Sequence, residues 1–170
     1  YDGDKMEGWM EYITYGGLPL VTLMKDDERK DAYLKEQQQN VYINAVIERN
    51  NISNESSIIT QMVKIISSSI GSLTNPKKIS DTFKSELDID IAPATISSYL
   101  KYLEEAFLIE NAKRYDIKGR KYISTPSKYY FSDLGLRNSF INFRQQEETH
   151  IMENAIYLEL KRRGYQVDVG

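Results

Sequence analysis

The chain has 170 residues, of which 41% are hydrophobic and 28% are charged, as in a folded protein with one ordinary domain or two small ones. Its 22 lysines and arginines face 25 aspartates and glutamates, so the net charge of −3 provides no overall positive field, and any nucleic-acid contact needs a local basic patch. The absence of cysteine and the single histidine exclude disulfide frameworks, thiol nucleophiles and Cys/His zinc sites.

The sequence contains no apolar run near the ~18 residues that a membrane-spanning helix needs. Its start, YDGDKMEGWM, is neither an initiator methionine nor a signal peptide. We therefore expect a piece of a longer protein, with no membrane partner and with the cytoplasm as its default compartment.

Two helices are predicted in the first third of the chain. Residues 7–15 can form a short helix, which YGGLP ends because paired glycines accept dihedrals that other residues avoid and Pro19 restricts Leu18. A second helix is expected over residues 26–48, with a buried stripe of Tyr33, Leu34, Val41, Tyr42 and Ala45.

The middle of the chain has the element order of a tri-helical winged helix. Apolar residues at helical spacing predict a first helix over residues 58–70, which Gly71 ends. Ser80 is expected to cap a short second helix, whose inner side would carry Ile79, Phe83 and Leu87. A third helix should begin at Pro93, with an apolar stripe of Ile96, Tyr99, Leu100, Leu103 and Phe107.

A β-hairpin is predicted after the third helix. The segment KRYDIKGRKYISTPSKYYFSD alternates and is rich in tyrosine and isoleucine, with Gly119 at the expected tip. Residues 58–131 would then form a winged helix in which residues 122–131 are strand rather than helix.

The end of the chain reads as a helix over residues 147–163, a Gly164 terminator and a strand in which Tyr165, Val167 and Val169 share one face. A lone strand cannot satisfy its hydrogen bonds, so this pair is predicted to open an α/β unit. The expected fold class is α+β, mainly α, with a helical region over residues 1–56, a winged helix over residues 57–133, and a linker with the first helix and strand of a truncated unit over residues 134–170.

Four stretches occur in a recognisable order: YITYGGLP, TISSYLKYLEEAFLIE, SKYYFSDLGLRN and MENAIYLELKRRGYQVDVG. Together they resemble the C-terminal region of a prokaryotic family of AAA-type ATP-binding proteins. The resemblance implies an ATPase module before this region, a winged-helix-like segment within it, and then a fold similar to restriction-endonuclease-like nucleases. ATP and magnesium would belong to the parent protein, because this chain lacks the G-x-x-x-x-G-K-[ST] loop that cradles phosphates.

The resemblance also places a nuclease-type acidic residue at Glu153, where it would help to hold Mg²⁺, while the remaining Asp and Glu-x-Lys would follow Gly170. The alternative is that Glu153 is a surface carboxylate or fixes its helix against a neighbour. His150, three residues earlier, could share a metal with it, but one such pair supplies too few ligands.

Two elements are candidates for DNA contact. The third helix would present Ala94, Thr95, Ser97, Ser98 and Lys101 at the end that enters a major groove, although Glu104 and Glu105 on its next turn would repel phosphate. The hairpin region, residues 110–128, carries only Glu110 and Asp116 as acids against six cations: Lys113, Arg114, Lys118, Arg120, Lys121 and Lys128. Such a patch suits phosphate contacts, while the alternative is a solvated hairpin whose lysines guard edge strands.

Other polar features have structural interpretations. Most of the 13 tyrosines, Tyr99 among them, are expected in the core rather than as base-stacking platforms. Asp133 and Arg137 are expected to form a local ion pair or a helix cap. The predicted function is a non-catalytic module of an AAA-type ATPase, contacting a partner or, weakly and nonspecifically, DNA. A magnesium-dependent nuclease and a purely structural assembly domain are the alternatives.

Overall fold

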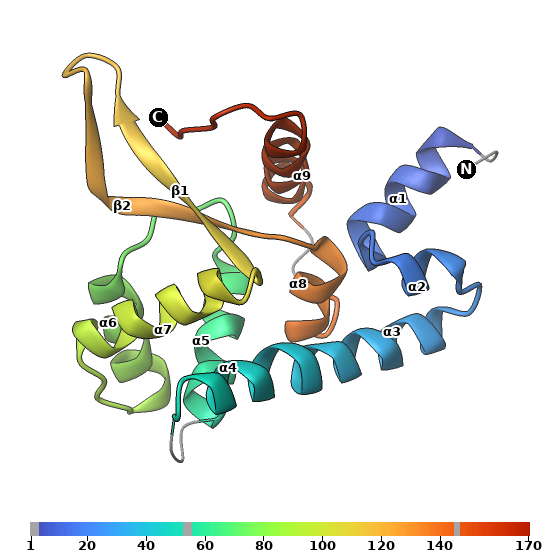
Figure 1. Cartoon of the computed structure of the whole chain (residues 1–170), viewed down its shortest axis with the longest axis horizontal. Coiled ribbons are helices and arrows are strands. Elements are labelled where there is room, and N and C mark those ends of the chain that lie inside the picture. Colours follow the sequence, from blue (N-terminus) through green and yellow to red (C-terminus); the bar gives the residue numbers. More distant parts are fainter. Residues whose placement is uncertain (1–3, 53–55, 145–146) are drawn as a thin grey trace.

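The computed structural model describes residues 4–52, 56–144 and 147–170. Helices dominate it, and one two-stranded antiparallel sheet projects from them (Figure 1). In chain order the elements are α1 Lys5–Tyr15, α2 Pro19–Leu23, α3 Asp27–Glu36, the π-helix η1 Gln37–Ile43, α4 Asn44–Arg49, α5 Ser56–Ser68, α6 Pro76–Leu87, α7 Pro93–Glu105, β1 Ile109–Asp116, β2 Lys121–Phe131, α8 Leu134–Phe140 and α9 Glu148–Arg162. The predicted α+β, mainly α class is confirmed.

The helix predicted over residues 26–48 is present as the continuous rod α3, η1 and α4, which runs along the lower edge of the molecule (Figure 1). Its predicted buried stripe is wrong at Val41, which is 49% exposed, and at Ala45, which is also exposed, while Ile43 and Val46 are buried instead. The reason is η1, because i→i+5 turns take in extra residues and shift the buried face relative to an α-helix. The short helix α2, with Pro19 at its first position, was not predicted.

The three helices expected in the middle of the chain are α5, α6 and α7. The apolar stripes of α5 and α7 are confirmed as far as Leu103, which is completely buried. The predicted cap of α6 is wrong: Asn75 caps it by accepting a hydrogen bond from the Lys78 amide at 2.8 Å, whereas Ser80 lies inside the helix and donates to the Ile91 carbonyl at 2.7 Å. Asparagine followed by proline at the first helical position is the stronger start signal.

Two ends of the predicted stripes are also wrong. Leu87, at the end of α6, is 37% exposed, and Phe107 is 78% exposed. Phe107 follows α7 in the left-handed region, with φ of 55°, so its side chain no longer continues the helical face.

Strands β1 and β2 form the predicted hairpin, with Ile109 opposite Phe131 and Asp116 opposite Lys121. The register shifts between Ala112 and Arg114, and residues 117–120 form the turn, so the expected tip around Gly119 is confirmed. The order of three helices and a hairpin is therefore as predicted.

The last helix, α9, ends at Gly164 with φ of 85°, as expected. The strand predicted after it is wrong, because residues 165–168 take no regular form and only Val169 pairs, in a parallel bridge with Arg114 of β1. Val169 donates its amide to the Lys113 carbonyl at 3.0 Å and accepts the Tyr115 amide at 2.8 Å. The segment thus finds hydrogen-bond partners on the edge of β1 rather than in a sheet of its own.

Helix α8, whose seven residues are all buried, packs against the end of α1 and the glycines that follow it. Asp133 caps it by accepting the Leu136 amide at 2.9 Å and also accepts the Gly17 amide at 2.7 Å. Asn138 donates to the Ile13 and Thr14 carbonyls, both at 2.8 Å. The YITYGGLP and SDLGLRN stretches are therefore packed together, and the helix-cap interpretation of Asp133 is confirmed.

Arg137, predicted as a possible local partner of Asp133, is instead directed elsewhere. Its side chain is 1% exposed and donates from Nε to the Ser67 carbonyl in α5 at 2.9 Å. Burial lowers the pKa of Arg137 to about 10, so the guanidinium still carries its charge at neutral pH.

None of the described helices combines the length and apolarity needed to cross a membrane.

Candidate nucleic-acid interface

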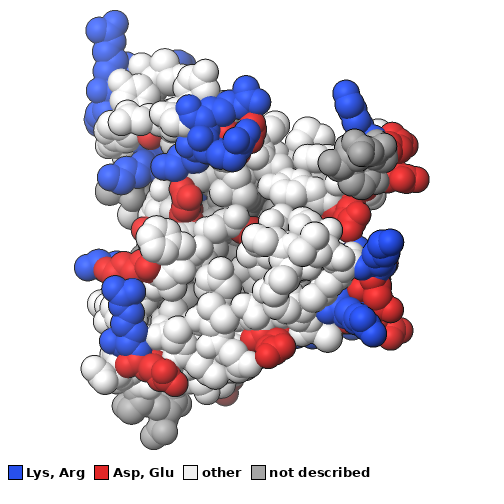
Figure 2. Space-filling model, turned by 45° about the vertical axis from the view of Figure 1, so that its right-hand side comes forward, with Lys and Arg blue, Asp and Glu red and all other residues white. Residues whose placement is uncertain are grey.

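The hairpin projects from the helical body and carries a group of basic side chains. Lys113, Lys118, Arg120 and Lys121 are exposed and Arg114 is half-buried. Within the described residues, no carboxylate lies in ion-pair distance of these five cations. In Figure 2, lysine and arginine side chains stand out in the upper part of the view, where the hairpin and the C-terminal end of α9 lie.

The turn at the hairpin tip is built so that its one acid is held by the backbone. Asp116 accepts hydrogen bonds from the Lys118 and Gly119 amides, both at 3.0 Å, so its carboxylate is engaged by the turn. Ile117 is 77% exposed beside it. Arg120 adopts φ of 51°, a left-handed conformation that is uncommon for residues other than glycine. The tip therefore presents an exposed isoleucine next to Lys118 and in the same turn as Arg120.

The sixth predicted cation, Lys128, is not part of this surface. It is half-buried, with Nζ 2.6 Å from Oε1 of Glu153 in α9. Five cations against Glu110 and Asp116 leave a local charge of +3 instead of the predicted +4. Glu110 itself accepts the Tyr157 hydroxyl at 3.2 Å and lies 3.6 Å from Lys161, so it also faces α9.

Glu153 is bound by the hairpin, so it fixes its helix against a neighbour, which was the alternative to a role in metal binding. Its Oε1 accepts both Lys128 and the Tyr130 hydroxyl, each at 2.6 Å. Burial alone would raise the pKa of Glu153, but these hydrogen bonds outweigh it and lower the pKa below its ordinary value. His150 Nδ1 lies 3.9 Å from Oε2. Among the described residues no three Asp, Glu, His or Cys side chains group to suit a metal ion.

Helix α7 offers a different surface. Ala94, Ser97, Ser98 and Lys101 are exposed, as predicted, whereas Thr95 is half-buried. Lys101, however, lies 3.6 Å from Glu105, so its charge is locally balanced. Glu104, expected to repel phosphate beside Glu105, is half-buried and bonded to Asn111 in β1, and burial raises its pKa. The exposed face of α7 therefore carries mostly small side chains, and its net charge is close to zero.

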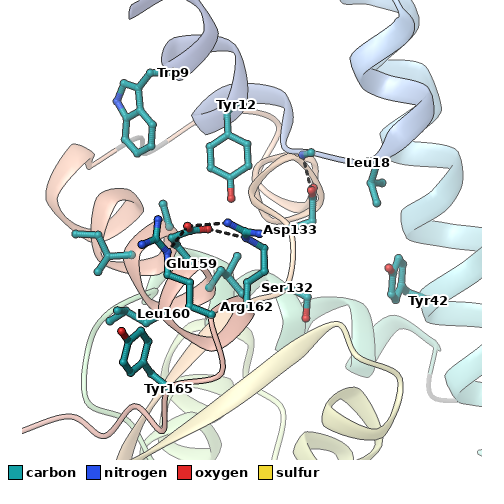
Figure 3. A pocket seen from close by; sticks show the side chains of 15 residues that line it. Trp9, Tyr12, Leu18, Tyr42, Ser132, Asp133, Glu159, Leu160, Arg162 and Tyr165 are labelled. Atoms are coloured by element: carbon teal, nitrogen blue, oxygen red, sulfur yellow. Dashed lines mark hydrogen bonds and ion pairs between the residues drawn. The ribbon is translucent and has the colours of Figure 1, made fainter. Parts of the chain in front are cut away.

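A cleft of about 990 Å³ opens between α1, η1 and α9 and was not predicted from the sequence (Figure 3). Trp9, Tyr12 and Tyr42 line one side, and Leu160 and Tyr165 line the other. Ile156 of α9, which also lines the cleft, is 53% exposed in the structure.

The charged groups of this cleft are mutually satisfied. Glu159 accepts two hydrogen bonds from Arg162, both at 2.8 Å, and one from Arg163 at 2.7 Å. These bonds lower the pKa of Glu159 to about 2. Asp133 also lines the cleft. Burial raises the pKa of its carboxyl group, although hydrogen bonds from backbone amides partly offset this shift. The cleft thus offers an aromatic, apolar wall but no unpartnered charge on these residues.

Comparisons with known proteins place the chain without naming a function. A protein of Haemophilus influenzae described as uncharacterized is 38% identical over 162 residues, which are 95% of this chain and 40% of that protein. An uncharacterized protein of Methanocaldococcus jannaschii is 34% identical over 155 residues, which are 91% of this chain and 34% of that protein. The chain thus spans roughly a third to two fifths of these curated relatives. No solved structure matches it.

The family comparison covers most of the chain. A family described as a domain of unknown function (DUF8612) matches residues 6–147, from the first helix to the segment before α9. The matched range includes the α1–α8 junction and the complete basic hairpin. The chain belongs to this family of domains of unknown function.

Proposed function

We propose that α5, α6, α7 and the β1–β2 hairpin form a winged helix that contacts duplex DNA weakly, with the hairpin as its phosphate-binding element. The observation that carries this proposal is the set of five hairpin cations without an ion-pair partner in the described residues. Unpaired lysines and arginines on a projecting ribbon can replace the counterions of several phosphates, which supplies affinity without sequence choice.

The hairpin supports this role better than α7 does. Lys101 is balanced by Glu105, and Ser97 offers one hydroxyl, so α7 adds little charge-based affinity. At the hairpin tip, by contrast, Asp116 is engaged by the turn. Arg120 places a long charged side chain at a backbone position that would favour glycine, and a strained residue in an exposed turn points to a function for its side chain.

We further propose that the domain is an accessory, non-catalytic part of a longer AAA-type ATP-binding protein and acts in the cytoplasm. The resemblance of the YITYGGLP and SDLGLRN stretches supports this, and the relatives leave 60% and 66% of their lengths outside the match. The purified Haemophilus influenzae relative should then hydrolyse ATP, and duplex DNA should change its rate. A protein without nucleotide binding would contradict this part of the proposal.

The test of DNA contact is a fluorescence-anisotropy titration with two unrelated duplexes at low salt. The hairpin variant K118A/R120A/K121A should lose affinity for both duplexes equally, by about tenfold or more. The helix variant S97A/K101A should remain within about threefold of the wild type. A selective loss of one duplex in the helix variant would show that α7 reads the DNA. Absence of binding by the wild type would favour the structural assembly domain.

A further inference from the structure

The tip of the hairpin carries an apolar residue where a purely electrostatic contact needs none. Ile117 is 77% exposed, close to the 78% of Leu23 and Phe107, the most exposed large hydrophobic residues among those described. It follows Asp116, whose carboxylate is engaged by two turn amides, and precedes Lys118. We infer that Ile117 is an apolar wedge that enters the minor groove of duplex DNA while the adjacent cations hold the flanking phosphates.

This inference rests on the proposed DNA contact and adds the groove and the mode of binding. A two-stranded ribbon is too wide to enter the minor groove, which is about 6 Å across, but single side chains at its tip can do so. Proteins that bind there insert isoleucine, leucine or similar residues between base steps and kink the duplex. Ile117 and Arg120 belong to the same four-residue turn, so both are available at the same point of contact.

The partner class follows from the neighbouring charges. A narrow minor groove, typical of A·T-rich DNA, has an enhanced negative potential that attracts inserted arginine. Arg120 is exposed and lacks an acidic partner among the described residues. We therefore expect a preference for A·T-rich over G·C-rich duplexes that depends on groove shape rather than on a base sequence.

An anionic membrane is the competing partner, since it also attracts cations beside an exposed apolar residue. The observations favour DNA, because membrane anchoring takes more buried apolar surface than one isoleucine supplies. Tyr122, the other exposed apolar side chain near the tip, donates its hydroxyl to Asp168 at 3.1 Å and lies edge-on to Tyr115, so it is directed along the hairpin.

The test uses the variants I117A, I117L and I117K with an A·T-rich duplex at several salt concentrations. I117A should bind about tenfold more weakly with an unchanged salt slope, because the truncated side chain is apolar. I117L should restore binding. I117K is the sharpest variant, because an added cation strengthens a purely electrostatic contact but removes a wedge. Ile117 is exposed, so all three variants should unfold at the wild-type temperature, which a melting curve checks.

Two further measurements separate the groove and the partner. Netropsin, which fills A·T-rich minor grooves, should displace the wild type but compete little with the double variant I117A/R120A, which lacks both side chains that enter the groove. Phosphatidylserine vesicles should bind the wild type and I117A equally weakly. The wedge is overturned if I117A matches the wild type, if I117K binds more tightly, or if the variants lose vesicle binding but keep DNA binding. If the wild type binds no duplex at all, the proposed function itself fails.

Discussion

Replacing Gly135 with alanine tests how α8 joins α1. An added Cβ would overlap the carbonyl group of Tyr15, which is backbone and cannot rotate away. In an exposed helix the same change would gain about 1 kcal/mol from helix propensity. Here the overlap should cost roughly 1 to 3 kcal/mol, and separating the helices would weaken the hydrogen bonds from Gly17 to Asp133 and from Asn138 to Ile13, about 1 kcal/mol each.

The net expectation for Gly135→Ala is a loss of about 3 kcal/mol in the free energy of unfolding, or roughly 6 to 12 °C in Tm. Urea unfolding followed by far-ultraviolet circular dichroism measures this loss. Trp9, the chain's one tryptophan, lies on α1 and reports its docking by fluorescence. The matched control is Gly164→Ala: its φ is 85° and its Cβ would meet nothing within 4 Å, so only about 1 kcal/mol of backbone strain applies. Wild-type or higher stability of G135A would show that α1 and α8 can move apart at no cost, contrary to this prediction.

Three further predictions concern the hairpin and its docking. N154A should cost about 2 to 4 kcal/mol in urea unfolding, because it leaves the buried amide and carbonyl of Phe131 without partners; the exposed-site control M152A should cost under about 0.5. Burial and the charge of Glu104 raise the pKa of Tyr129 to about 12. The stability gained by keeping the Tyr129 hydroxyl protonated in the folded state is complete below pH 10 and is lost as pH rises through 12. Y129F has no such hydroxyl, so between neutral pH and pH 11 it should lose about 1 kcal/mol less free energy of unfolding than the wild type. R120G should keep its Tm, because left-handed strain is relieved, yet bind DNA more weakly by anisotropy.

The sequence pattern predicted the elements whose buried face keeps one period. Ile59, Met62 and Val63 in α5 recur at helical spacing and are all completely buried. The pattern failed at Val41, because the π-helical turns of η1 change the period inside a helix that is otherwise continuous. A single sequence shows the spacing of residues but not the hydrogen-bond ladder that sets their phase.

The sequence predicted five of the six cations of the basic surface correctly and was wrong about Lys128. Local spacing indicated a hairpin with cations near Gly119, and those at the tip are exposed. Lys128 was grouped with them, although its partner Glu153 lies 25 residues away on α9. The cleft lined by Trp9 and Tyr165 was missed for the same reason, since its walls come from opposite ends of the chain.

The most direct test of the hairpin as phosphate-binding element is the slope of log Kd against log salt concentration for one duplex. Two variants each remove three positive charges: K118A/R120A/K121A at the hairpin, and the control K5A/K25A/R29A on exposed residues near α1 and α3. The hairpin variant should reduce the slope by up to about 2.7, at ~0.9 for each phosphate that is no longer neutralised, while the control should change it by less than about 0.5. Equal changes in the two variants would contradict the account, because binding would then follow net charge and not the hairpin.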